Sequence, residues 1–151
     1  MILTAHILTG AAIVTKTQNP FLGLLFAFLS HYLLDFLPHN DYSEKLKNIK
    51  ERRWKKSFFD FSLVILDFSF GVLLVFLFSK NLFLSLVGGF FAVLPDTFSL
   101  LHFLFHKNKL LNKYYIFQKE KLHYFNNKKV SVFWQTLVQA SVILISIFFL
   151  L

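Results

Sequence analysis

Long apolar segments alternate with polar ones along this chain, and five of the apolar segments are long enough to form helices. They cover residues 2–15, 21–37, 58–78, 82–105 and 130–151. A run of about 18 or more mostly apolar residues is typical of a helix that crosses a bilayer. The third segment has only two Asp, two Ser and one Gly as interruptions. The pattern predicts a single all-α domain over residues 1–151, an integral membrane bundle of about five transmembrane helices.

The five segments differ in what we expect them to contact. Residues 2–15 are short for a full crossing, so this helix is expected to be tilted or largely enclosed by the others. Gly88 and Gly89 permit another backbone to approach closely, within the chain or across a homodimer. Residues 130–151 contain no ionisable side chain and are expected to face lipid. Between the second and third segments, residues 42–54 predict an amphipathic helix at the membrane surface.

Charge adds an orientation to this picture. The chain has 16 Lys and Arg against 8 Asp and Glu, a formal net charge of +8. All but Lys16 and Lys80 of these basic residues fall in two polar segments, residues 38–57 and 106–129. Short basic loops stay on the cytoplasmic side, so we expect a multi-pass protein of the bacterial inner (cytoplasmic) membrane with its N-terminus inside. The positive charge then contacts membrane lipids with anionic headgroups rather than nucleic acid.

Ionisable residues inside the apolar segments gather in the half that lies near the basic loops. A carboxylate at this depth costs a few kcal/mol, and no Lys or Arg lies inside these helices to offset it. A divalent cation neutralises two carboxylates and binds several imidazoles, and His with Asp, without Cys, is a ligand set for Zn or Mn. We therefore expect a site for one or two divalent ions, zinc or else manganese, with these ligands: His6, His31, Asp35, Asp67 and Asp96.

Spacing supports this hypothesis. His31 and Asp35 stand at i, i+4 and share one helical face, and Asp60 and Asp67, seven residues apart, also share a face. Asp60 is nearest the membrane surface and is expected to orient ligands. We expect His39 or His102 to act as the general acid–base group or as an extra ligand.

Short motifs in the first two thirds of the chain resemble a known family. Thr4-Ala5-His6 with Gly10, then His31-x3-Asp35-x2-Pro38-His39, then Leu94-Pro95-Asp96, look like the small bacterial inner-membrane metal-dependent hydrolases of the LexA-regulated type. This resemblance implies a membrane hydrolase with an early His and a Leu-Pro-Asp turn at its site.

A more local resemblance involves the second segment alone. His31-x3-Asp35-x2-Pro38-His39 is similar to the His-x3-Asp…Pro-x-His stretch of zinc-dependent phospholipase C and the zinc nucleases. It implies that His31 and Asp35 bind zinc, Asp35 as a bridge between two ions, and that His39 serves the second ion. The N-terminal Trp of those enzymes is absent, so His6 would act in its place.

These observations predict a membrane-embedded metal-dependent hydrolase that acts on a phosphoester of a lipid or lipid-linked substrate at the cytoplasmic leaflet. The alternative is a small transporter, or a conduit for protons or divalent metals, because buried Asp and His also mark ion pathways. A conduit needs polar residues in both halves of the membrane, and the outer half offers few. A non-catalytic adaptor ranks last because it leaves the buried carboxylates unexplained.

Overall fold

The computed structural model describes residues 1–39, 47–51, 53–105, 107–122 and 130–151. Regular structure in these ranges is helical throughout. The five predicted helices are present, within two residues of the expected bounds: α1 (Leu3–Lys16), α2 (Pro20–Phe36), α4 (Phe58–Phe78), α5 (Leu82–Leu104) and α7 (Val132–Leu150). The all-α prediction is confirmed.

Local chemistry explains where several helices begin. Asn19 accepts hydrogen bonds from the amides of Phe21 and Leu22, and Pro20 occupies the first position of α2, where its missing N–H costs nothing. Asn81 caps α5 through the amide of Leu84. Such caps satisfy amides that have no partner inside their own helix.

The two basic segments contain short helices. The first holds α3 (Lys47–Lys50) and the 3₁₀ turn η2 (Trp54–Lys56); of the amphipathic helix predicted over 42–54, residues 42–46 and 52 lie outside the described ranges. The second segment was expected to be a loop, yet it forms α6 (Lys109–Phe117) and then η3 (Gln118–Leu122), a turn of π-helix. Asn108 caps α6 through the amides of Leu110 and Leu111.

Three helices are long and apolar enough to cross a membrane. They are α4, α5 and α7, with 21, 23 and 19 residues, whereas α2 is a shorter apolar helix and α1 has 14 residues. Large apolar side chains stand on the outside of the bundle, for example Phe21, Phe58 and Phe83, which are 82%, 83% and 79% exposed. A surface of this kind suits lipid rather than water, so the membrane character of the chain is supported by its structure.

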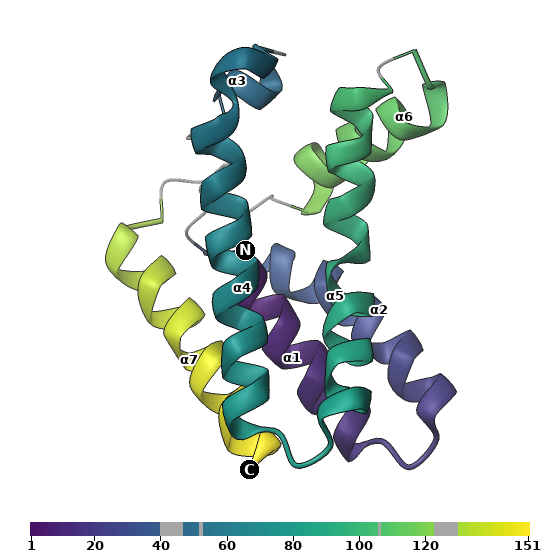
Figure 1. Cartoon of the computed structure of the whole chain (residues 1–151), viewed down its shortest axis with the longest axis vertical. Coiled ribbons are helices and arrows are strands. Elements are labelled where there is room, and N and C mark those ends of the chain that lie inside the picture. The colour runs from purple at the N-terminus through teal and green to yellow at the C-terminus, as the bar shows by residue number, and fades with distance from the viewer. Residues whose placement is uncertain (40–46, 52, 106, 123–129) are drawn as a thin grey trace.

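Helix α1 lies at the centre of the bundle, as Figure 1 shows, and packs against α2, α4, α5 and α7. Ten of its fourteen residues are buried, which confirms that this short helix is enclosed by the others. Its closest approach is to α5. A Cβ atom added to Gly10 would lie 2.5 Å from the Gly88 carbonyl oxygen, so only glycine fits at this crossing. The predicted close approach at Gly88 and Gly89 is therefore made by α1 of the same chain.

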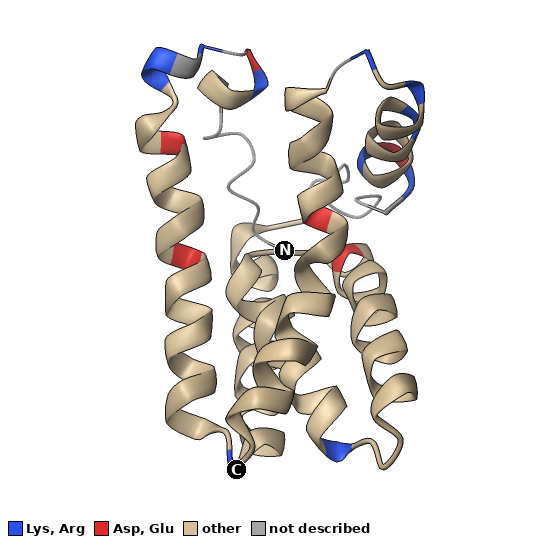
Figure 2. Ribbon diagram, turned by 45° about the vertical axis from the view of Figure 1, so that its right-hand side comes forward, with Lys and Arg blue, Asp and Glu red and all other residues tan. Residues whose placement is uncertain are grey.

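The charged residues divide between the two ends of the bundle. Lys and Arg gather at the end that carries α3 and α6, and all the Asp residues inside the apolar helices lie in the half nearest that end (Figure 2). At the other end, Lys16 is the last residue of α1 and Lys80 lies just after α4. The chain thus has one polar end, as the charge pattern predicts.

Candidate metal centre

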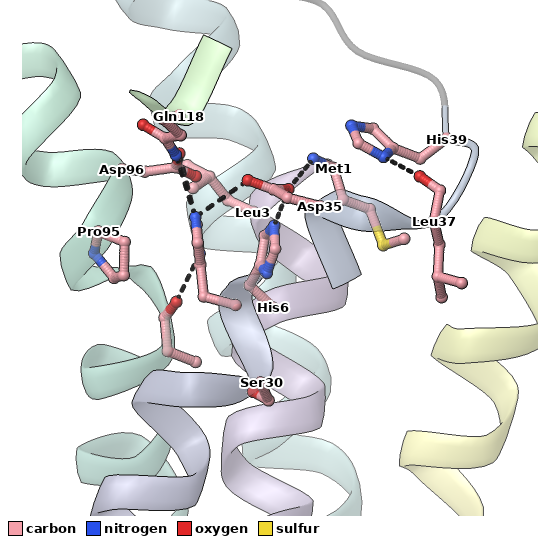
Figure 3. A network of polar contacts seen from close by, with 12 residues as sticks. Met1, Leu3, His6, Ser30, Asp35, Leu37, His39, Pro95, Asp96 and Gln118 are labelled. Atoms are coloured by element: carbon pink, nitrogen blue, oxygen red, sulfur yellow. Dashed lines mark hydrogen bonds and ion pairs between the residues drawn. The ribbon is translucent and has the colours of Figure 1, made fainter. Parts of the chain in front are cut away.

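A buried polar cluster lies at the polar end of the central helices, where α1, α2 and α5 meet η3 (Figure 3). Helix α1 contributes His6 and α2 contributes His31 and Asp35, all of them at most 1% exposed. Asp96 follows Pro95 on α5 and is 30% exposed, and Gln118 opens the π-helical turn. Residues far apart in the sequence thus meet at one point.

The ring of His31 is oriented by the backbone of α5. Its Nδ1 lies 2.9 Å from the carbonyl oxygen of Ala92; because a carbonyl oxygen only accepts, Nδ1 carries the proton and donates it. In the neutral ring, Nε2 then presents a lone pair to the cluster. That atom lies 3.1 Å from Asp35 Oδ2 and 3.6 Å from Asp96 Oδ1. A histidine that binds metal is usually held in this way, with its other N–H donated to a carbonyl or carboxylate.

His6 stacks against His31, with ring centroids 4.2 Å apart and an interplanar angle of 23°. Its Nε2 lies 3.2 Å from Asp35 Oδ1. Within the described part of the chain, neither ring nitrogen of this fully buried residue makes a hydrogen bond of normal geometry. A buried imidazole without such bonds is costly, so the site has a reason to hold a further partner for His6.

Three of the predicted ligands have the arrangement of a metal site. One ligand atom from each of His6, His31 and Asp96 lies within 4.8 Å of the other two. Zinc–ligand bonds of about 2.0–2.1 Å in a tetrahedron place ligand atoms roughly 3.3–3.5 Å apart, so small side-chain movements would bring this group around one ion. The group could hold a metal ion.

Asp35 lies beside this group and contacts both histidines. Its Oδ2 faces His31 and its Oδ1 faces His6, and the same Oδ1 accepts a 2.6 Å hydrogen bond from the α-amino group of Met1. The predicted i, i+4 pairing with His31 is present. Asp35 therefore orients two imidazoles and brings a second negative charge to the centre, while its direct bond to a metal stays a prediction.

Asp67 and Asp60 do not join the cluster, and each instead holds the start of a helix. Asp67 accepts from the amides of Leu3 and Thr4 at 2.6 and 3.2 Å, and from the Thr4 hydroxyl at 2.6 Å. Asp60 accepts from the amides of Asn48 and Ile49 at 2.8 and 3.0 Å. The geometry gives no support to Asp67 as a ligand or to Asp60 as a residue that orients ligands. Both carboxylates are stabilised by amides at the positive end of a helix dipole.

The two histidines predicted for acid–base chemistry also lie away from the cluster. His39 is buried, and its Nδ1 lies 2.7 Å from the Leu37 carbonyl, beyond Met1 as seen in Figure 3. His102 stacks on Tyr115 of α6 with centroids 4.7 Å apart. Neither belongs to the group formed by His6, His31 and Asp96. His106 and His123 lie outside the described residues.

Two residues of the second basic segment belong to the site and were not predicted. Gln118 Nε2 lies 3.2 Å from His31 Nε2 and 3.3 Å from Asp96 Oδ1. Tyr114 donates to the Pro95 carbonyl at 3.2 Å; burial, and after it the hydrogen bond with Tyr32, raises the pKa of Tyr114 well above its usual range, so the donor keeps its proton. Tyr114 and Gln118 stand at i, i+4 among exposed lysines, and this spacing could have revealed a helix with one face turned toward the bundle.

Comparisons of the chain with protein-family models, with curated proteins and with solved structures found no match. The described residues define an all-helical protein with three helices long and apolar enough to cross a membrane, and with a largely buried His-His-Asp group that could hold a metal ion.

Proposed function

We propose that this protein is a membrane-embedded, metal-dependent hydrolase that cleaves a phosphoester in a lipid or lipid-linked substrate at the cytoplasmic leaflet. The observation that carries the proposal is the orientation of His31. Its Nδ1 is committed to the Ala92 carbonyl, so its Nε2 lone pair points at the place where His6 and Asp96 also converge.

The contacts of His31 Nε2 favour a cation at this place. When the ring is neutral, the lone pair faces the ionised Asp35 Oδ2 at 3.1 Å with no hydrogen between them. A cation bound to Nε2 would attract both carboxylates and remove this repulsion. A protonated ring, with the Gln118 amide turned so that its oxygen faces Nε2, is the alternative that metal analysis has to exclude.

Two imidazoles and a carboxylate are a ligand set for zinc, and manganese accepts it too. When bound, such an ion makes a coordinated water acidic enough to act as a nucleophile and stabilises the oxygens of a phosphoryl group. In this chain His6, His31 and Asp96 would hold the ion, and Asp35 would fix the two rings and balance the charge. His39 and His102 have no position in this scheme.

The surroundings of the centre support a lipid substrate with an anionic headgroup. The described polar end of the bundle carries these exposed basic residues: Lys50, Arg53, Lys55, Lys56, Lys107, Lys109, Lys113, Lys119 and Lys121. A positive surface of this kind attracts anionic headgroups. Asp96 is the one partly exposed member of the ligand group, so we expect access from the polar end. The resemblance of the His31 and Leu94-Pro95-Asp96 motifs to membrane hydrolases agrees with this reading.

The rival function, an ion conduit, is disfavoured by the packing beneath the cluster. Leu8, Ala11 and Val14 of α1 are completely buried, and among them the backbone of Gly10 lies close against that of Gly88. This part of the described bundle is apolar and tightly packed, which leaves the site open at one end only. A conduit would require polar groups through this layer.

Metal analysis and hydrolysis together test the proposal. We expect protein purified in detergent to contain zinc or manganese, and to release phosphate or headgroup from vesicles that contain anionic phospholipid. Asp96→Asn should lower both metal content and rate at least tenfold, because it removes an ionised ligand. Glu51→Gln, the same chemical change at an exposed site, should change neither. Protein that binds no added zinc or manganese would refute the proposal, whereas metal-dependent flux of ions across proteoliposomes would favour the conduit.

A further inference from the structure

Gln118 lies in the buried cluster, although the three candidate ligands His6, His31 and Asp96 already form a group without it. Its side chain is buried, with 4% of the residue exposed, while Lys119, Glu120 and Lys121 beside it are exposed. Burying a carboxamide is costly unless its hydrogen bonds are satisfied. The turn that carries it is π-helical, a rare geometry often found at functional sites.

Contacts along α6 fix where Gln118 lies. One turn earlier, the Tyr114 hydroxyl lies 3.4 Å from that of Tyr32 on α2 and donates to the Pro95 carbonyl on α5. The ring of Tyr114 packs edge-on against Phe98. At the other end of the amide, the Ser99 hydroxyl donates to Gln118 Oε1. These contacts hold the carboxamide between two ligands of the candidate centre.

The distances from the amide to those ligands are those between neighbouring ligands of one ion. Gln118 Nε2 lies 3.2 Å from His31 Nε2 and 3.3 Å from Asp96 Oδ1, and ligand atoms around tetrahedral zinc are roughly 3.3–3.5 Å apart. The amide therefore lies next to two of the three atoms that would bind the ion, at the spacing expected of a further ligand.

An amide nitrogen does not bind a metal, but the amide oxygen does. A half-turn of the carboxamide exchanges Oε1 and Nε2 with little change in shape. Oε1 would then face the ion, and Nε2 would donate to Ser99 Oγ, because a hydroxyl both donates and accepts. Both orientations of the amide are thus satisfied by the same neighbours, one without an ion and one with it.

We infer that Gln118 is the fourth ligand of the centre, through its side-chain oxygen, and that it is the ligand which a substrate oxygen replaces. A neutral amide oxygen is a weaker ligand than a charged phosphoryl oxygen, so the substrate displaces it while the two histidines and Asp96 stay. The inference rests on the proposed metal centre and adds to it a ligand from the basic segment that faces the membrane surface.

Cobalt(II) binding separates this inference from the proposed function, because its visible absorption reports the ligands directly. We expect the detergent-purified wild type to bind Co²⁺ with the strong absorption of a four-coordinate site. Gln118→Ala should weaken Co²⁺ binding about tenfold or more and shift the absorption as water replaces the amide. Gln118→Glu should bind Co²⁺ more tightly than the wild type, because it supplies a charged oxygen. Gln135→Ala on α7 is the matched control and should leave both measurements unchanged.

Each outcome decides one of the two claims. Wild-type affinity and absorption in Gln118→Ala, together with lost binding in Asp96→Asn, would overturn the role of Gln118 and leave the metal centre standing. A wild type that binds no Co²⁺ would overturn the centre and the ligand together. If Gln118→Ala fails to fold, Gln118→Glu carries the test: equal or weaker Co²⁺ binding than in the wild type would overturn the inference.

Discussion

Asp67 accepts hydrogen bonds from the amides of Leu3 and Thr4, whereas Asp96 faces His31 and Gln118. Both carboxylates lie within apolar helices, and both are costly to bury. Two or three backbone N–H groups can stabilise a carboxylate as well as a cation can. The cost of burial alone, which is what the sequence reveals, does not say which kind of partner an Asp has.

Substitution of Asp67 distinguishes a cap from a ligand. Asp67→Asn places an NH₂ group against one of the α1 amides and removes the charge that favours the helix N-terminus. We expect a loss of stability of about 1–2 kcal/mol, seen as a lower thermal unfolding temperature in detergent, with full metal content once the protein is saturated with zinc.

Ser69→Ala, at an exposed position of the same helix, should leave the unfolding temperature unchanged. If Asp67→Asn instead unfolds like the wild type but binds no zinc, Asp67 is a ligand after all.

The candidate ligands on α2 and α5 could be predicted because each side chain has a short-range signal. His31 and Asp35 stand one turn apart, and Asp96 follows a proline. Gln118 could not be found in this way, since its partners lie 22 and 87 residues away and an uncharged amide adds nothing to a charge argument.

At the level of elements, the crossing of α1 and α5 connects packing with chemistry. The backbones meet at Gly10 and Gly88, one turn from Ala92, whose carbonyl orients His31. Interiors packed at this density transmit small displacements. The crossing thus sets the position of the carbonyl that fixes the His31 ring.

Adding a methyl group at this crossing should affect both properties. The Cβ of Gly10→Ala would lie 2.5 Å from both the Ala92 Cβ and the Gly88 oxygen, so the helices must separate. We expect a loss of about 1–3 kcal/mol in stability and weaker zinc affinity, measured by thermal unfolding and by competition with a zinc chelator.

Gly23→Ala is the control, because it adds the same methyl group at a less crowded helix contact. Its Cβ would lie 3.2 Å from Val14 Cα, a contact that small shifts relieve, and the site is far from the cluster. Equal losses of zinc affinity in the two variants would show that the crossing does not position His31.

The helices themselves were predictable because length and hydrophobicity decide them. Apolar blocks between polar segments gave the bounds of the five helices to within two residues. Helix α6 was missed since its lysines made the segment resemble a loop, although Asn108 and the inward Tyr114 and Gln118 are helical signals. The glycine pair predicted a close approach, but the sequence does not say that α1 makes it.

For the whole molecule, the polar end predicts how the bundle is oriented across the membrane. We propose that all five apolar helices lie in the bilayer, α1 sheltered by the other four, with the α3 and α6 segments in the cytoplasm. Reporter fusions within residues 107–113 should then be active as cytoplasmic reporters, and fusions after Leu151 as external ones. A fusion to Lys80, in the turn between α4 and α5, serves as a second external control. Both basic segments reporting from outside would reverse the orientation and place the centre in the outer leaflet.

The enclosure of α1 has a consequence for how the protein is made. A nascent chain delivers α1 to the membrane before any of the helices that surround it, and α7, whose Ser146 meets Thr9 of α1 at 3.0 Å, comes last of the described helices. His6 meets its native neighbours when α2 is added and Thr4 when α4 is added, but the Thr9 hydroxyl has to wait for Ser146 of α7. If all five apolar helices lie in the bilayer, as proposed above, we expect α1 to stay at the insertion machinery or at the lipid surface until α7 has been added.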